Sequence, residues 1–150
     1  MKIKLGLIGN SISQSRAPFL HRMLGDIYGV DVTYNLNDPG ENSREAFEGM
    51  LQTLKDEGYT GCNVTFPFKA LAVEYVDEPD QAVDEVGATN TLYLADGKVR
   101  ATNTDYTGFI RGYKARRGDK PAGEVLMLGA GGVGRAVAFG LFHCGTTKLR

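Results

Sequence analysis

The chain has 150 residues, of which 42% are hydrophobic and 23% are charged, and its formal net charge at pH 7 is −1. This composition is typical of a globular protein with one ordinary domain or parts of two. The near-neutral charge argues against a nucleic-acid-binding protein and against a protein bound to an anionic membrane surface. No apolar run is long enough to span a bilayer.

The first part of the chain alternates between strand and helix patterns. Residues 2–9 predict a strand that follows the N-terminus directly, so no secretory signal is expected. Residues 18–28 carry apolar side chains at helical spacing, and residues 30–36 alternate as a second strand. Ser43 predicts the N-cap of a helix that Gly58 stops.

A third strand ends at Asn63-Val64-Thr65, because Pro67 cannot donate to a strand ladder. Residues 68–76 predict a helix, which would place the Lys69 cation in a first turn, where the helix dipole disfavours it. A residue set against a local rule hints at function, and ligands of open α/β sheets bind at the carboxyl ends of strands. A solvated lysine beside an ordinary strand end explains this stretch equally well.

The middle of the chain predicts a short helix that reaches Val86 and then a β-hairpin over residues 87–102 with Asp96-Gly97 as its turn. A helix opened by Asn103-Thr104-Asp105 and a polar linker over residues 116–123 follow. Strands thus alternate with helices along nearly the whole chain. This alternation predicts an α/β fold with a mostly parallel sheet.

A glycine-rich turn follows a predicted buried strand over residues 124–128 and precedes a helix over residues 135–144. Its glycines have the spacing of a dinucleotide-binding turn, and the strand–turn–helix context favours a nucleotide site over a purely structural turn. The candidate cofactor-binding residues are Gly129, Ala130, Gly131, Gly132, Val133 and Gly134. One strand, one helix and the start of another strand at residue 146 are too few to bury a core. We therefore expect these 150 residues to be the front part of a longer protein.

Five motifs in this order resemble the shikimate dehydrogenase family: Ser15-Arg16-Ala17-Pro18, Asn63-Val64-Thr65-Phe66-Pro67-Phe68-Lys69, Gly87-Ala88-Thr89-Asn90-Thr91, Asn103-Thr104-Asp105 with Gly108-Phe109, and Gly129-Ala130-Gly131-Gly132. The resemblance covers essentially the whole chain. It implies a three-layer substrate-binding domain over residues 1–104, a connecting helix and linker over residues 105–123, and the first βα unit of a Rossmann domain over residues 124–150. It also implies reduction of 3-dehydroshikimate to shikimate with NADP or NAD, and some members of the family act on quinate.

The resemblance implies a catalytic pair, Lys69 and Asp105. Its other implied substrate-binding residues, beside Asp105, are Ser15, Asn63, Thr65 and Asn90. The residue types suit the chemistry, because a ketone that accepts a hydride needs a proton, which an ammonium beside a carboxylate can supply. Short polar side chains suit a polyol, because a site built to hydrogen-bond hydroxyl groups rejects analogues without them.

Two positions depart from the family pattern. Ala17 stands where many members carry a second hydroxyl residue, which leaves quinate or a related cyclic hydroxy acid open as the substrate. Val133-Gly134 stands where the biosynthetic enzymes commonly have an Ala-Ser pair, which weakens the assumption that the cofactor is NADP. A rival of another class is a non-catalytic polyol-binding or nucleotide-binding module, against which the Lys69 and Asp105 pair argues, because binding alone needs no proton donor.

The remaining residues that carry reactive groups favour ordinary roles. Cys62 and Cys144 lack metal-ligand spacing, so we expect no metal site and two reduced thiols in a cytoplasmic protein. His21 lies beside the apolar stripe of the first helix and is interpreted as structural or solvated. The expected partner is a small-molecule substrate, with no nucleic acid and no membrane, and the expected assembly is a monomer or a homodimer.

Overall fold

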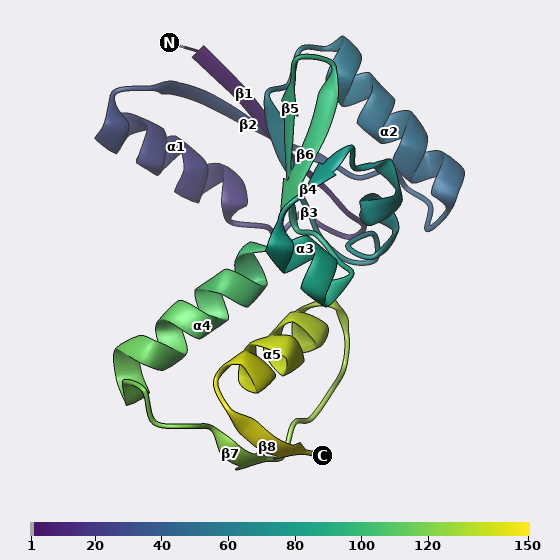
Figure 1. Ribbon diagram of the computed structural model, residues 1–150. Coiled ribbons are helices and arrows are strands. Elements are labelled where there is room, and N and C mark those ends of the chain that lie inside the picture. The colour runs from purple at the N-terminus through teal and green to yellow at the C-terminus, as the bar shows by residue number, and fades with distance from the viewer. Residues whose placement is uncertain (1) are drawn as a thin grey trace.

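The computed structural model describes residues 2–150 and contains two sheets with helices packed around them (Figure 1). The strands are β1 (Lys2–Ile8), β2 (Asp31–Asn37), β3 (Gly61–Val64), β4 (Glu78–Pro79), β5 (Thr91–Ala95), β6 (Lys98–Thr102), β7 (Gly123–Val125) and β8 (Thr146–Leu149). The α-helices are α1 (Ala17–Tyr28), α2 (Arg44–Asp56), α3 (Gln81–Val86), α4 (Thr104–Arg117) and α5 (Gly132–His143). A short 3₁₀ helix covers Leu71–Tyr75.

The larger sheet has six strands in the order β2-β1-β3-β5-β6-β4. The pairings of β1 with β2, β1 with β3 and β4 with β6 are parallel. The β5–β6 hairpin is antiparallel, and β5 also pairs antiparallel with β3. The prediction of an α/β fold with a mostly parallel sheet is therefore confirmed.

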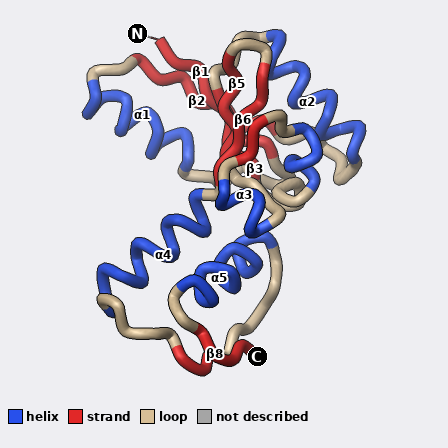
Figure 2. The backbone as a smooth tube through the Cα atoms, viewed as in Figure 1, coloured by secondary structure: helices blue, strands red, loops and turns tan. Residues whose placement is uncertain are grey.

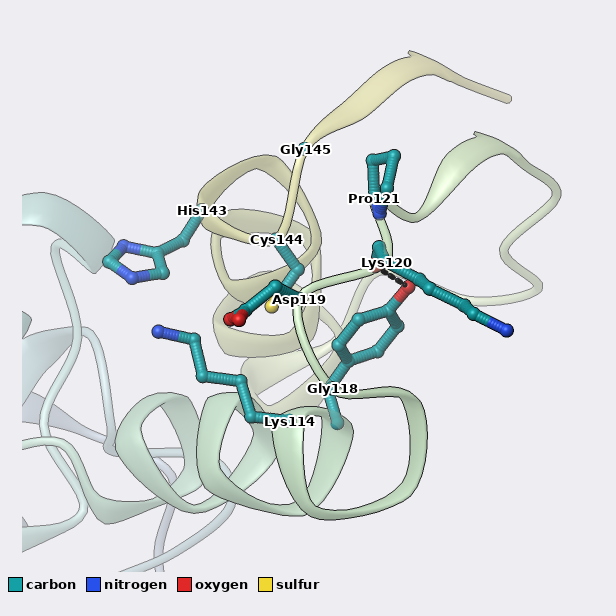
Figure 3. Close-up of a pocket in the computed structure, with 9 residues that line it drawn as sticks. Lys114, Gly118, Asp119, Lys120, Pro121, His143, Cys144 and Gly145 are labelled. Atoms are coloured by element: carbon teal, nitrogen blue, oxygen red, sulfur yellow. Dashed lines mark hydrogen bonds between the residues drawn. The ribbon is translucent and has the colours of Figure 1, made fainter.

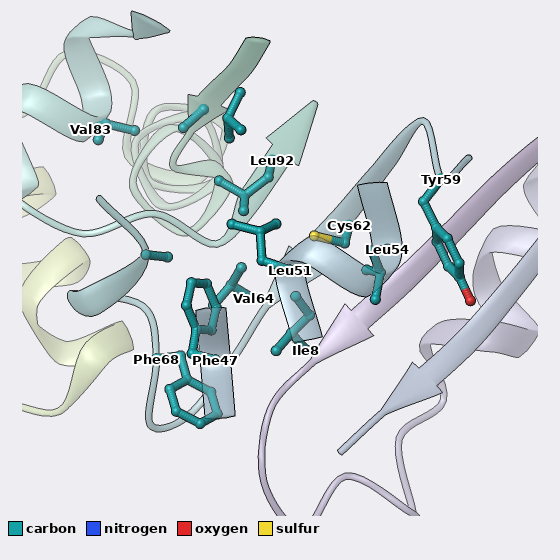
Figure 4. Packing of buried hydrophobic residues seen from close by; sticks show 13 residues of the cluster. Ile8, Phe47, Leu51, Leu54, Tyr59, Cys62, Val64, Phe68, Val83 and Leu92 are labelled. Carbon is teal, nitrogen blue, oxygen red and sulfur yellow. The ribbon is translucent and has the colours of Figure 1, made fainter. Parts of the chain in front are cut away.

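Helices α1 and α2 lie on opposite sides of this sheet (Figure 1). Ser43 caps α2 as predicted, and its side chain accepts a hydrogen bond from the Ala46 amide at 3.1 Å. Phe47, Leu51 and Leu54 follow at helical spacing and are at most 2% exposed. They pack against side chains of β1 and β3 and against Phe68. Together these residues form the main core (Figure 4).

Helix α1 covers only the β1–β2 side of the opposite face. It ends at Gly29 in a left-handed conformation, with φ at 67°, which agrees with the predicted end of this helix. Gly25 allows its close approach to the sheet, because a Cβ there would lie 2.7 Å from Val32 Cγ2. The outer part of its apolar stripe stays in solvent within the described chain, with Phe19 72% and Tyr28 77% exposed.

Two predicted boundaries differ from the structure in the region that follows β3. Residues 66–70 form turns and only Leu71–Tyr75 are helical, so the predicted helix over residues 68–76 is wrong in type and in start. The argument that Lys69 opposes a helix dipole is therefore wrong as well. The first predicted hairpin strand begins at Thr91 and not at residue 87, because Gly87 ends α3 with φ at 63°.

The second sheet contains only β7 and β8, which are parallel, and it lies apart from the main sheet beyond α4 and α5 (Figure 2). The strand–turn–helix order that was predicted around the glycine-rich turn is confirmed. A strand is present where residues 124–128 predicted one, but β7 ends at Val125. Its predicted burial is wrong, because Leu126 and Leu128 are 74% and 90% exposed. Within residues 2–150 only β8 pairs with β7.

None of the helices formed by residues 2–150 combines the length and apolarity that a bilayer crossing requires.

Candidate functional site

Two neighbouring cavities open beyond the carboxyl ends of β1 and β3. The first, of about 430 Å³, has Ser15, Asn63, Thr65, Lys69 and Asn90 in its wall. The second, of about 370 Å³, lies between the turns that follow β3 and the glycine-rich turn, and Ala130–Val133 line it. Thr65, Phe66 and Lys69 line both cavities. The structure thus brings the predicted substrate-binding and cofactor-binding residues together on two sides of one shared wall.

The two predicted catalytic residues form an ion pair. Lys69 Nζ lies 2.6 Å from Asp105 Oδ2, and the side chains are 11% and 25% exposed. Asp105 is in the first turn of α4, where the helix dipole stabilises a negative charge. At such low exposure this pair is screened less by solvent than a surface ion pair. The ammonium is consequently held in one place at the edge of both cavities.

Asn103 fixes the start of α4 and with it the position of Asp105. Its side chain is fully buried and accepts a hydrogen bond from the Tyr106 amide at 3.1 Å, which caps the helix. Its Nδ2 donates to the Ala88 carbonyl at 2.8 Å. A buried amide bonded on both sides cannot turn without losing a hydrogen bond, so the carboxylate of Asp105 stands on a rigid base.

The side chain of Asn63 takes part in three hydrogen bonds, one accepted and two donated. The Tyr34 hydroxyl donates to Asn63 Oδ1 at 2.8 Å, and Asn63 Nδ2 donates to Thr91 Oγ1 at 3.1 Å and to the Asn90 carbonyl at 3.3 Å. Tyr34 is 1% exposed, and burial raises the pKa of its hydroxyl, which stays a donor. The amide of Asn63 is therefore oriented before any ligand arrives.

Asn90 is oriented in a similar way by Thr104. The Thr104 amide donates to Asn90 Oδ1 at 2.9 Å, and Asn90 Nδ2 donates to Thr104 Oγ1 at 2.8 Å. Thr104 directly precedes Asp105, so this contact joins the start of β5 to the start of α4. Asn90 reaches the site from the entry to an antiparallel strand, next to the carboxyl ends of the parallel ones.

Ser15 and Thr65 complete the predicted set. Ser15 Oγ accepts a hydrogen bond from the Ala17 amide at 3.3 Å, and both residues line the larger cavity. Thr65 packs tightly on the loop after β1, because a Cβ on Gly9 would lie 2.3 Å from Thr65 Cγ2. All five predicted substrate-binding positions therefore lie at this edge of the sheet: four in the cavity wall, and Asp105 through its contact with Lys69.

Sequence reasoning missed Tyr34 and Thr104. Tyr34 belongs to the alternating pattern of β2, which only predicted a strand, and its place next to β1 is a matter of sheet order. Its ring also stacks on His21, with centroids 4.4 Å apart, and burial lowers the pKa of that histidine. Cys62 is 3% exposed, and burial raises the pKa of its thiol to about 12.

The glycine-rich turn has the features that a dinucleotide phosphate needs. Gly131 caps α5, and no side chain of residues 2–150 bonds to the first amide groups of that helix. These amides are therefore available to an anion at the positive end of the helix dipole. A Cβ on Gly131 would have no neighbour within 4 Å, which leaves the backbone open to close approach. The residues present thus fit a pyrophosphate group.

A third cavity, of about 300 Å³, lies at the other end of α4 and α5 and is shown in Figure 3. Lys114, Asp119 and His143 are among its lining residues, and the Tyr113 hydroxyl donates to the Lys120 carbonyl at 2.9 Å. None of the predicted site residues lines it. Within residues 2–150 no cluster of three or more His, Cys, Asp or Glu side chains is arranged to hold a metal ion.

Comparison with known proteins gives consistent matches over nearly the full chain. A quinate/shikimate dehydrogenase (NAD(+)) from Corynebacterium efficiens is 36% identical over 99% of this chain and 53% of its own length. A shikimate dehydrogenase (NADP(+)) from an Arthrobacter species is 34% identical over 97% of this chain and 50% of its own length. The chain thus spans about half the length of the curated relatives it matches.

Solved structures match equally well. The quinate dehydrogenase of Corynebacterium glutamicum in complex with NAD gives a TM-score of 0.87 at 35% identity, over 99% of this chain and 54% of that one. The shikimate 5-dehydrogenase of Thermus thermophilus in complex with NADP(H) and shikimate gives 0.83 at 30% identity, over 98% and 55%. The family model described as the shikimate dehydrogenase substrate binding domain matches residues 7–92. This match covers more than half of the chain and agrees with the six-stranded sheet and the site at its edge. The chain therefore belongs to the shikimate dehydrogenase family.

Proposed function

We propose that the protein carries out the NAD(P)-dependent, reversible reduction of 3-dehydroshikimate to shikimate. The observation that carries the proposal is the position of the Lys69–Asp105 pair, whose lysine lines both the cavity of polar side chains and the cavity beside the glycine-rich turn. A reaction between a polar small molecule and a dinucleotide needs a proton donor at the boundary between the two sites.

In this proposal Lys69 supplies the proton and Asp105 positions it. As the carbonyl carbon gains a hydride, its oxygen becomes negatively charged and takes a proton from the Lys69 ammonium. The carboxylate of Asp105 holds the ammonium and accepts hydrogen bonds from substrate hydroxyl groups. Asn63, Thr65 and Asn90 bind further hydroxyl groups, and Ser15 binds the substrate carboxylate.

The cofactor in this proposal is NADP or NAD, which supplies the hydride when bound. Gly129, Ala130, Gly131, Gly132, Val133 and Gly134 would hold its phosphates through backbone amides at the start of α5. Relatives of both cofactor types are known by name, with NAD(+) in the Corynebacterium efficiens enzyme and NADP(+) in the Arthrobacter enzyme. The proposal therefore includes both nucleotides.

A second candidate substrate is quinate, and Ala17 favours it. Ala17 lies in the wall of the larger cavity beside Ser15 and presents only a methyl group. Quinate carries a hydroxyl on the ring carbon that bears the carboxylate, and a smaller side chain leaves room for that group. We therefore keep quinate as an alternative substrate of the same site.

The proposal is tested by following reduced nicotinamide by its absorbance, with the full-length protein, shikimate or quinate, and each oxidised nucleotide. Turnover of shikimate with either nucleotide supports the proposal, and turnover of quinate alone supports the second candidate. Binding of ligands without any turnover would instead favour a non-catalytic polyol-binding or nucleotide-binding module.

The proposal also includes a cytoplasmic location, an oligomeric state and a partner. Both cysteines are free and buried, which suits the reducing conditions of a cytoplasm. The assembly that we propose is a monomer or a homodimer, which sedimentation equilibrium distinguishes. The proposed partner is the small-molecule substrate.

A further inference from the structure

The glycine-rich turn contacts the side chain of Lys69 directly. Gly132, the first residue of α5, has no side chain, and a Cβ at this position would lie 3.2 Å from Lys69 Cδ and 3.8 Å from its Cβ and Cγ. Carbon atoms in favourable contact lie about 3.5–4.0 Å apart, so the first of these distances is too short for an undisturbed methyl group. The stem of Lys69 therefore occupies the space that a side chain at position 132 would need.

Lys69 is held at its other parts as well. Its carbonyl accepts a hydrogen bond from the Thr89 amide at 2.8 Å, and its ammonium lies 2.6 Å from Asp105 Oδ2. Its side chain is only 11% exposed, so most of its surface is in contact with the protein. A group that displaced the methylene carbons of Lys69 would consequently displace its ammonium as well.

Helix α5 cannot move away to avoid such a displacement without losing other contacts. Arg135, one turn after Gly132, places Nη2 3.1 Å from where a Cβ on Gly87 would lie. Ala136 is fully buried against side chains of α3 and α4, and Gly140 lies so close to Phe109 that a Cβ there would meet the ring at 2.6 Å. One face of α5 is thus fitted along its length to the part of the chain that precedes it (Figure 1).

We propose that Gly132 is a positioning residue for the reaction: its missing side chain leaves the passage through which Lys69 reaches Asp105. The glycine-rich turn then has two tasks, since it presents amides to a dinucleotide and also sets the place of the ammonium. This inference rests on the proposed function, because it assigns Lys69 the role of proton donor.

The kinetic test is Gly132→Ala in the full-length protein, with Gly112→Ala as the matched control. Gly112 also lies in a helix, and a Cβ there meets nothing within 4 Å. We expect Gly132→Ala to lower kcat by between about tenfold and a hundredfold, because a displacement of an ångström or less at a reacting group has effects of this size. The KM for the nucleotide should stay near the wild-type value. An unchanged kcat with a raised nucleotide KM would overturn the inference, because Gly132 would then act only on the cofactor.

A double-mutant cycle asks whether the effect passes through Lys69. In a Lys69→Ala background, Gly132→Ala should cause no further loss, because the group that it displaces has been removed. An equal loss in both backgrounds would show that Gly132 does not act through Lys69. Thermal melting of both glycine variants separates a loss of fold from a loss of position, and alanine is intrinsically the better helix residue.

A chemical measurement tests the contact without any assumption about the substrate. Reductive methylation of lysines, followed by mass spectrometry, reports how accessible the Lys69 amine is. Gly132→Ala should raise the labelling rate of Lys69 relative to Lys114, and Gly112→Ala should not. Raised labelling in a protein without dehydrogenase activity would leave the contact standing while the proposed function fails. Unchanged labelling in an active enzyme would overturn the inference alone.

Discussion

Lys69 and Asp105 meet although 36 positions separate them in the sequence, and each side chain depends on a different local device. Lys69 lies in the turns after β3, while Asp105 lies in the first turn of α4, which Asn103 caps. The resemblance to the shikimate dehydrogenase family implied that these residues belong to one site. The reasons for their positions, in particular the buried bonds of Asn103, depend on contacts between distant segments.

The proposed roles of this pair predict different kinetic effects. Lys69→Ala should lower kcat by about a hundredfold or more, because it removes the proton donor, and should change KM little. Asp105→Asn should lower kcat and also raise KM, because the residue positions the lysine and binds substrate. Steady-state kinetics with shikimate measures both, and small, equal effects on kcat would contradict the assignment.

Ala17 predicts a change of substrate preference. In Ala17→Ser, a hydroxyl that reaches the substrate carboxylate adds one hydrogen bond to a charged group, worth about 1.5–3 kcal/mol. This corresponds to roughly a tenfold to hundredfold rise in kcat/KM for shikimate. For quinate we expect a loss, since the added hydroxyl fills the room beside its extra group. Kinetics on both substrates measure the effect, and no change for either would show that position 17 does not face the substrate.

At the scale of the elements, sequence patterns were reliable where a cap and an apolar spacing agreed. Helix α2 has Ser43 at one end and a buried face at positions 47, 51 and 54, so local and tertiary preferences coincide. Residues 68–76 were misread because a stretch of two turns is too short for propensity to decide. The segment from residue 124 to 128 was misread because burial depends on neighbouring strands, which a local apolar run does not reveal.

The cap of α2 gives a prediction of stability. Ser43→Ala should lower the free energy of unfolding by about 1 kcal/mol, because the Ala46 amide loses its partner. Ser43→Asp is the matched control, since aspartate also accepts this hydrogen bond, and it should retain most of the stability. Urea denaturation followed by circular dichroism measures both variants. A loss of the same size in Ser43→Asp would show that the hydroxyl, and not the cap, is required.

At the scale of the whole molecule, the two sheets differ in how they are supported. Strand β1 is paired along both edges and lies between helices, whereas β7 and β8 pair only with one another in the part of the chain that the structure describes. Leu126 and Leu128 beside β7 are mostly exposed. Stability should therefore be uneven along the chain, with the lowest values near β7 and β8.

Hydrogen exchange with mass spectrometry tests this difference in the 150-residue chain. We expect amides of β1 and β3 to exchange at least about tenfold more slowly than those of β7 and β8, because local opening of a two-stranded sheet disrupts fewer contacts. Peptides from α2 serve as an internal reference for the main core. Equal protection of both sheets would show that the chain opens as one cooperative unit.

Strand β5 runs antiparallel to its neighbour β3, so the entry to β5, at Asn90, is the part that reaches the site. The turn of the hairpin, at Asp96 and Gly97, consequently points to the opposite edge of the sheet. Five residues of extended chain separate the two ends by about 16 Å. This turn is therefore a suitable place for an affinity tag or a fluorescent label, where an insertion would leave the chemistry undisturbed.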